Sequence, residues 1–433
     1  MTISTLPDDA LLEIFKFYVD ESYNMDAWHT LVHVCRKWRY VVFASPRWLH
    51  LELRCTTRRP VKKLLDIWPA LPIVIQFGSN IANSPQSHEI NLIAALERHD
   101  VVCRIELYDV SNSLLNSAAM KKRFPMLTDL TLVSYEKNVP VISDSFLDGS
   151  APRLETLLLS GIPFPFPALR KLLLSATDLV YFRLENIPNS GIISPDLIVT
   201  TLSTLTSLQY LHFEFRSPRP RADRERRHSS LSKRLVLPSL TDFDFKGDSE
   251  YLEVIIGRID APALNIFTII FFNQLVFDTP QLREFFSRTE GFREPHRAEV
   301  LVTRSDIQVK LSRLEWMANH GELLDVTIWS SAAEFQLSSL AQFCSSSLPP
   351  LPILEHLSIH GYNYQGLNEG WTDDMEGDQW LELLHPFVAV KHLVLPLRFE
   401  DASRLATALR ELMGTRQQTC YLHFDESSYI LIT

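Results

Sequence analysis

Glycine and cysteine are scarce in this chain, which has 13 glycines and five cysteines among 433 residues. The glycine-dependent phosphate loops GxGxxG and GxxxxGK[ST] do not occur in the sequence, and neither does the GxSxG turn of hydrolases. The cysteines form no CxxC pair, so the sequence predicts neither a disulfide framework nor a zinc cluster. We therefore expect no enzymatic activity, no cofactor and no bound metal.

Long apolar runs are also missing from the sequence. The strongest run, Ile266 to Phe272, has the length of a buried strand and falls well short of the roughly 20 residues that a membrane span needs. The opening Leu6-Pro7-Asp8-Asp9 is too acidic for a signal peptide. With 52 acidic against 42 basic residues, the net charge of −10 disfavours nucleic-acid binding. We expect an intracellular protein, cytoplasmic or nuclear, without a membrane or nucleic-acid partner.

Two amphipathic segments open the chain. Pro7 and the two aspartates after it favour a helix start, and apolar residues then recur at helical spacing as far as Val19. A second helix is predicted from about Asp26, with a single apolar stripe made of Leu31, Val34, Cys35, Trp38 and Val42. A segment this short buries its apolar surface poorly by itself. The rest of this chain or a partner protein must cover that surface.

These residues resemble an F-box over about residues 4 to 53. The opening Leu6-Pro7-Asp8-Asp9-Ala10-Leu11-Leu12-Glu13-Ile14-Phe15, the stretch Leu31-Val32-His33-Val34-Cys35-Arg36-Lys37-Trp38-Arg39 and the close Ser45-Pro46-Arg47-Trp48 are similar to the form common in fungal proteins. One departure is that Trp48 follows Arg47 directly, without the usual leucine between them.

The F-box resemblance implies a three-helix module that docks on the Skp-type adaptor of a Skp–cullin–F-box ubiquitin ligase, and through it on a cullin and a RING subunit. It implies groove contacts from Leu6, Pro7, Leu11, Ile14 and Phe15. Further contacts, or support for them from behind, would come from Val34, Cys35, Trp38 and Trp48.

Beyond Cys55, apolar residues recur at positions i, i+3 and i+5. The interval between units is 24 to 32 residues from Leu130 to Phe267, and the pattern is weakest over 270–322, where only Val300 is assigned to it. Such a period is typical of a leucine-rich-repeat solenoid, in which each unit supplies one short parallel strand. Helices are predicted between strands at Leu197–Leu202, Tyr251–Ile256, Gln281–Phe286 and Leu405–Leu412.

The predicted fold is therefore α/β, with a three-helix F-box over 1–55, a joint and N-terminal cap over 56–100, and an irregular solenoid with a parallel concave sheet over 101–433. The solenoid is expected to be irregular because the asparagine or cysteine that ordinary leucine-rich repeats place after the last leucine is replaced, for example by Tyr135 and Ile162.

Side chains alternate along a strand, so the residues flanking the inward leucines should share the concave face. Aromatic, cationic and acidic residues are mixed on neighbouring strands in the middle of the predicted sheet. This stretch is the candidate contact surface for an unknown protein substrate; an ordinary solvated sheet face is the alternative. Its residues are Tyr181, Arg183, Glu185, Tyr210, His212, Glu214, Asp242, Asp244 and Lys246.

Two histidine pairs have metal-like spacing. His29 and His33 lie one helical turn apart, but the sequence HTLVH lacks the glutamate of a zinc-protease helix; His356 and His360 share a strand face without a third ligand in view, so no metal site is predicted. The basic segment 216–234 and the acidic segment 369–378 are interpreted as loops. The sequence thus predicts a substrate-recognition adaptor of a Skp–cullin–F-box ligase. The alternative is a non-catalytic repeat scaffold that does not engage a cullin.

Overall fold

The computed structural model groups the chain into two compact units, Met1–Leu179 and Val180–Thr433. It describes residues 6–21, 27–56, 61–68, 71–78, 85–135, 142–218, 234–272, 277–292, 295–303, 306–313, 322–329, 336–348, 351–361, 377–387, 389–395, 420–424 and 428–432. The predicted helix 405–412 and nearly all of the two predicted charged loops lie outside these residues.

The first unit opens with three helices, α1 (Asp8–Glu21), α2 (Ala27–Val34) and α3 (Arg36–Ala44). The expectation of one continuous second helix was wrong, because the chain breaks at Cys35. This residue has extended backbone angles (φ −159°, ψ 171°), and its Sγ accepts a hydrogen bond of 3.5 Å from the Trp38 amide. Cys35 thus caps the start of α3. The break separates the predicted apolar stripe into two helix faces and leaves Val34 56% exposed.

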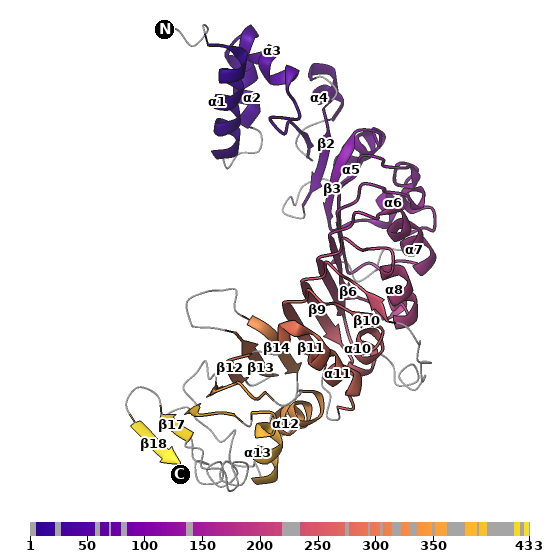
Figure 1. The fold of residues 1–433 in the computed structure, drawn as a ribbon. Helices are drawn as coiled ribbons and strands as arrows, with labels where there is room; N and C mark the ends of the chain where they lie inside the picture. The colour runs from indigo at the N-terminus through magenta and orange to yellow at the C-terminus, as the bar shows by residue number, and fades with distance from the viewer. Residues whose placement is uncertain are drawn as a thin grey trace. The chain divides into compact units, whose positions relative to one another are not determined.

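Five parallel strands follow in chain order in the first unit: β1 (Leu53–Cys55), β2 (Ile73–Phe77), β3 (Val102–Tyr108), β4 (Asp129–Val133) and β5 (Thr156–Ser160). Their apolar centres are in register, with Ile105 beside Leu130 and Leu130 beside Leu157. One side of these strands carries helices (Figure 1). The helical segments are α4 (Val61–Ile67), α5 (Pro85–Leu96), α6 (Asn112–Leu115), η2 (Ala119–Lys121), η3 (Phe146–Gly149) and α7 (Phe166–Ser175).

The second unit begins with four parallel strands, β6 (Tyr181–Ile187), β7 (Tyr210–Phe215), β9 (Asp242–Gly247) and β11 (Ile266–Phe271). The predicted helices are confirmed as α8 (Pro195–Leu202) and α10 (Ser249–Ile256), which lie between strands, and α11 (Pro280–Arg288), which follows β11. Large apolar side chains fill the space between strands and helices: Phe182, Leu211, Phe243 and Phe267 are each 0% exposed. Shorter elements complete this part: η4 (Asn189–Gly191), β8 (Leu235–Val236), β10 (Ile259–Asp260) and η5 (Glu290–Phe292).

After β11 the strand order departs from one parallel strand per repeat. The strands β12 (Arg297–Val302), β13 (Asp306–Ser312) and β14 (Glu322–Trp329) form an antiparallel meander. Its last strand, β14, pairs in parallel with β11, and its first, β12, pairs in parallel with β15 (His356–Gly361). The Val300 segment is a strand, β12, and it is parallel to β15 but antiparallel to β13, because the short connection from β12 to β13 permits only a hairpin.

Two further strands, β16 (His392–Leu395) and β17 (Cys420–Phe424), continue the parallel pairing, and β18 (Ser428–Ile432) pairs antiparallel with β17. Two helices, α12 (Gln336–Ser347) and α13 (Gly377–Leu384), belong to this part of the chain. The predicted α/β class with mostly parallel strands is confirmed. Within the part of the chain that the structure describes, no helix combines the length and apolar character required to cross a membrane.

Candidate functional site

The helical module, α1 to α3, has its own apolar core. Leu11 and Phe15 are 1% and 0% exposed, and the Phe15 ring packs on the Trp38 ring with 4.7 Å between centroids. These two residues were predicted to line a groove for a partner. Their burial means that they support the outer face of α1 from within and do not contact a partner directly while the module is folded.

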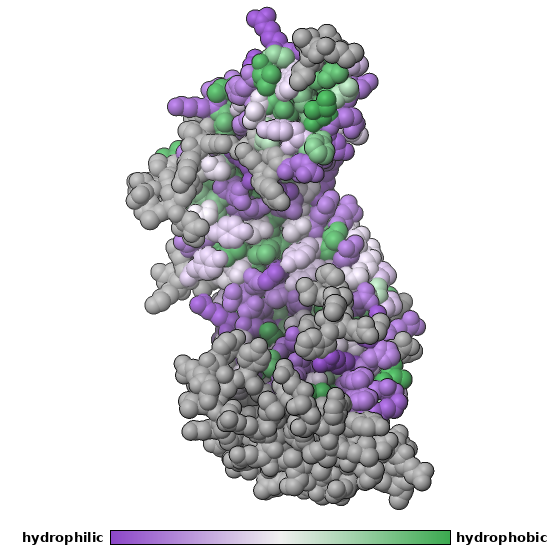
Figure 2. Space-filling model, turned by 90° about the vertical axis from the view of Figure 1, so that its left-hand side faces the viewer, coloured by the Kyte–Doolittle hydropathy of each residue, from purple (hydrophilic) through white to green (hydrophobic). Residues whose placement is uncertain are grey.

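The outer side of α1 carries three large exposed side chains. Ile14, Phe17 and Tyr18 are 49%, 67% and 42% exposed. Their i, i+3, i+4 spacing places them on one side of the helix, and we call them the α1 apolar face. Hydrophobic side chains show green at the top of Figure 2, where the N-terminal helices lie. The F-box resemblance named Ile14 only; the helical spacing of Phe17 and Tyr18 from Ile14 was the signal that could have added them.

The other predicted adaptor-binding residues divide between surface and interior. Pro7 and Cys35 are exposed, whereas Leu6 and Trp38 are half-buried. Trp48 is 48% exposed, and the Lys16 ammonium lies 4.3 Å from the centre of its ring. The exposed members remain candidates for contact with a partner.

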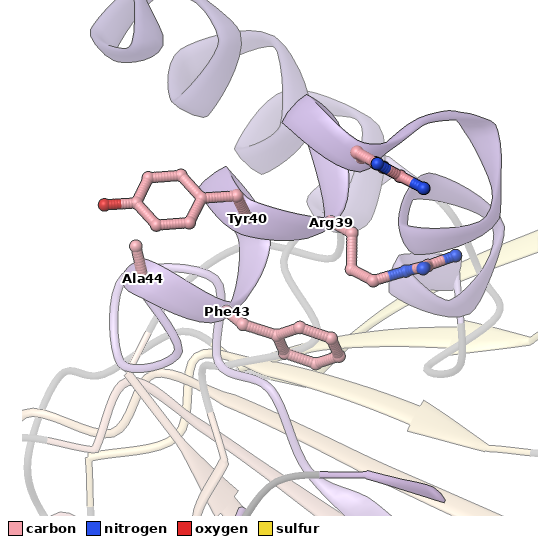
Figure 3. A pocket seen from close by; sticks show the side chains of 5 residues that line it. Arg39, Tyr40, Phe43 and Ala44 are labelled. Atoms are coloured by element: carbon pink, nitrogen blue, oxygen red, sulfur yellow. The ribbon is translucent and has the colours of Figure 1, made fainter.

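A shallow hollow of about 390 Å³ lies on α3, lined by Arg36, Arg39, Tyr40, Phe43 and Ala44. In Figure 3 the Arg39 and Phe43 side chains extend toward the same side of the helix. Arg39 is held in place because its Nε donates a hydrogen bond of 2.9 Å to the Val32 carbonyl. A mixture of arginine and aromatic side chains is typical of protein interfaces.

Trp28 attaches the helical module to the rest of its own unit. This side chain is 1% exposed, and its ring lies 6.1 Å from the Phe43 ring and 5.3 Å from the Trp68 ring, measured between centroids. The His29 ring also stacks on Trp68, at 5.1 Å. Described residues of the chain therefore cover one side of the module, whereas the side chains of the α1 apolar face stay exposed.

In the second unit, the predicted substrate-contact residues share one face of β6, β7 and β9. Along each strand, buried apolar residues alternate with half-buried polar or aromatic ones. The half-buried set, here called the polar strand face, comprises Tyr181, Arg183, Glu185, Tyr210, His212, Glu214, Asp242, Asp244 and Lys246. Strand register brings Tyr181 beside Tyr210, and Tyr210 beside Asp242.

Hydrogen bonds order the middle of the polar strand face. The Tyr181 and Tyr210 rings stack with 4.2 Å between centroids and 2° between planes. The Tyr210 hydroxyl donates to Asp244 Oδ2 at 2.5 Å, and His212 Nδ1 lies 3.3 Å from the same oxygen. Asp242 accepts a 2.6 Å hydrogen bond from the Thr241 hydroxyl.

Ion pairs continue this network on both sides of His212. Lys246 Nζ lies 2.8 Å from Glu214 Oε1 and 4.3 Å from the centre of the Trp329 ring. Arg183 pairs with Glu185 on the same strand. His212 Nε2 lies 3.6 Å from Glu214 Oε2, which is too far for a hydrogen bond.

The protonation of these groups follows from their contacts. The interaction with His212 lowers the pKa of Glu214 to about 2, against the effect of burial and with further help from Lys246. Burial favours neutral Asp244, but hydrogen bonds from His212 and Tyr210 outweigh it and lower the pKa of that carboxyl. Burial raises the pKa of Tyr210, and the hydrogen bond to Asp244 adds to it. Both carboxylates are therefore charged at neutral pH, which suits recognition of polar groups.

No protein-family model matches this chain, and no curated protein matches it.

Proposed function

We propose that the protein is a non-catalytic, substrate-recognition adaptor of a Skp–cullin–F-box ubiquitin ligase. The exposed α1 apolar face is the observation that carries the proposal, because it lies within the residues that resemble an F-box. Its three side chains are 42% to 67% exposed, although the same module buries Leu11 and Phe15 almost completely. Large exposed apolar side chains gathered on one face mark a site that another protein covers.

The polar strand face supplies the second half of the proposal. It presents a stacked tyrosine pair, three basic or imidazole groups and several carboxylates on adjacent strands. Tyrosine and arginine are enriched among residues that dominate binding energy. In this proposal the face holds a target protein, and ubiquitin transfer by the partner subunits gains from proximity alone.

Co-purification with a Skp-type adaptor tests the first half. The variant Ile14→Asp/Phe17→Asp changes only exposed positions, so its helical content should equal that of the wild type. We expect binding to fall roughly 30- to 1,000-fold, the equivalent of about 2–4 kcal/mol for an interface anchor. Leu174→Asp is the matched control, since Leu174 is an exposed leucine (42%) on α7, in the same unit but outside the module.

Unchanged adaptor binding by the folded double variant would overturn the docking proposal. A second step distinguishes the scaffold alternative from the ligase assignment: a cullin–RING pair is added to the purified chain–adaptor complex. A stable complex containing the cullin supports the ligase assignment. A chain–adaptor complex that excludes the cullin supports a scaffold.

A further inference from the structure

Three potential metal ligands meet on the polar strand face. One ligand atom each from Glu185, His212 and Glu214 can be chosen so that all three lie within 4.8 Å of one another. They are the only such group of three or more among the described residues. His212 and Glu214 are 13% and 18% exposed, and Glu185 is 17% exposed, so the group is largely shielded from water.

The imidazole of His212 is oriented as a ligand. Its Nδ1 lies 3.3 Å from Asp244 Oδ2, which can only accept the Nδ1 proton, and its Nε2 lies 3.6 Å from Glu214 Oε2, where a bound metal ion would take the place of a proton on Nε2. Nε2 is buried and has no hydrogen-bond partner within the described residues. A carboxylate behind the far nitrogen is the usual support of a metal-binding histidine. Asp244 is itself held by the Tyr210 hydroxyl at 2.5 Å.

A local irregularity in β6 lies beside Glu185. Arg183 and Leu184 pair with His212 and Phe213, but the register then shifts so that Ile187 pairs with Phe215. Asn186, within this bulge, has a positive φ of 48°. Glu185 is two residues from Arg183, the strand partner of His212, so alternation along the strand puts Glu185 on the same face as His212.

The neighbouring cations occupy only part of each carboxylate. Lys246 contacts Glu214 Oε1, whereas Oε2 of the same group faces His212. Arg183 contacts Glu185 through Oε1. Carboxylates that bind a metal through one oxygen are commonly hydrogen-bonded through the other, so Arg183 and Lys246 are compatible with metal binding as outer partners.

We propose that Glu185, His212 and Glu214 bind one divalent transition-metal ion, with Zn²⁺ as the best match to the donors. Zn²⁺ takes imidazole nitrogen and carboxylate oxygen at about 2.0–2.2 Å, so tetrahedral ligand atoms are roughly 3.4 Å apart. The His212–Glu214 separation of 3.6 Å is close to this value. The Glu185 oxygen lies within 4.8 Å of the other two ligand atoms, so metal binding would require its side chain to move closer to them. An imidazole ligand disfavours Mg²⁺ and Ca²⁺, which prefer oxygen donors.

Three protein ligands leave one position of a tetrahedral ion open. Because the ligands lie on the face that we propose for target binding, the open position would take water or a donor side chain of the target. The metal proposal does not depend on ubiquitin-ligase activity, since it concerns binding by the isolated chain.

Zinc binding by the purified full-length chain tests the proposal. The protein is equilibrated with ZnCl₂ at pH 8, desalted and assayed for bound zinc, with affinity measured by competition against a chromophoric chelator. We expect the wild type to hold one equivalent more than His212→Ala. His360→Ala is the matched control, because His360 Nε2 also lies 3.6 Å from a glutamate oxygen, that of Glu299, but belongs to no three-ligand group among the described residues.

The supporting residue gives an independent readout. Asp244→Asn should weaken zinc binding about 10- to 100-fold without removing a ligand, and Co²⁺ bound to the wild type should show the absorption of a tetrahedral site that His212→Ala lacks. Should His212→Ala unfold, Glu185→Gln replaces the carboxylate ligand by a neutral, weakly coordinating amide with little change in volume. Equal zinc content in the wild type and in a folded ligand variant, or no zinc bound by the wild type, would overturn the proposal.

Discussion

The indole rings of Trp28 and Trp68 meet edge to face, with 5.3 Å between centroids and 73° between planes. Trp28 belongs to α2, and Trp68 follows α4 directly, so this contact links the helical module to the strands of its own unit. The α1 apolar face, on the same module, has no comparable cover among the described residues, with Phe17 67% exposed.

Trp68→Ala should therefore loosen the module. Loss of a half-buried aromatic contact predicts a destabilisation of about 2 kcal/mol, visible as a lower denaturant midpoint and as faster proteolysis between residues 45 and 72. Trp48→Ala is the control, because Trp48 is 48% exposed and its described contact is Lys16 over its ring. Equal effects of the two substitutions would argue against a linking role for Trp68.

Leu11→Asp and Ile14→Asp should have opposite consequences, although both lie on α1. Leu11 is 1% exposed, so an aspartate there buries an unpaired charge and should cost more than about 3 kcal/mol. Ile14 is 49% exposed, and its replacement should change stability by about 0.5 kcal/mol or less. Thermal unfolding followed by circular dichroism distinguishes the two; a strongly destabilised Ile14 variant would contradict the placement of this side chain.

Gly161→Ala tests the turn that follows β5. Gly161 has a φ of +68°, and a Cβ built there would lie 2.3 Å from the Ser134 carbonyl oxygen. A residue with a side chain is strained in this conformation even without the clash, so we expect a loss of at least about 2 kcal/mol in unfolding free energy. Gly78→Ala, where an added Cβ meets nothing within 4 Å, should be nearly neutral. Similar midpoints for both variants would show that the backbone relaxes freely at Gly161.

The carboxyl of Glu253 predicts a pH dependence of stability. It caps α11 from the neighbouring helix, accepting hydrogen bonds from the Gln281 and Leu282 amides at 2.9 and 2.7 Å. Burial nevertheless raises its pKa to about 7, from an ordinary value of 4.5. Because this pKa is higher in the folded than in the unfolded state, proton binding by Glu253 stabilises the fold. Its contribution to the free energy of unfolding is fully present below about pH 4.5 and is lost as the pH rises through 7.

Glu253→Gln removes this titration and keeps the volume. Relative to the wild type, the variant should gain stability between pH 5 and pH 8, measured as the difference in denaturant midpoint at each pH. Other titrating groups contribute to both proteins and cancel in the difference. A difference that does not change over this range would mean that Glu253 is charged throughout it.

Much of the strand arrangement was predictable because burial alternates along a strand. The centres Leu130, Leu157, Phe182, Leu211, Phe243 and Phe267 all lie in buried strand positions. The same alternation predicted the polar strand face, where residues such as Tyr210 and His212 are brought together as expected. These features depend only on a period of two and are therefore readable from sequence.

What the sequence did not predict depends on local backbone geometry and on pairing partners. The helix break at Cys35 comes from a capping thiol inside an otherwise continuous apolar pattern. The bulge in β6 after Leu184 shifts the register with β7 by one residue and has no apolar signature. The meander of β12 to β14 was missed because hydrophobic alternation does not encode strand direction.

The meander also affects the order in which a nascent chain can assemble. The strand that pairs with the free edge of β11 is β14, which begins at Glu322. Residues 272–321 must therefore be synthesised before this pairing can form. An open, apolar strand edge is prone to pairing with other chains, and contacts over such separations form slowly. Until β14 is available, we expect the free edge of β11 to be a site where the growing polypeptide is prone to aggregate or to bind a chaperone.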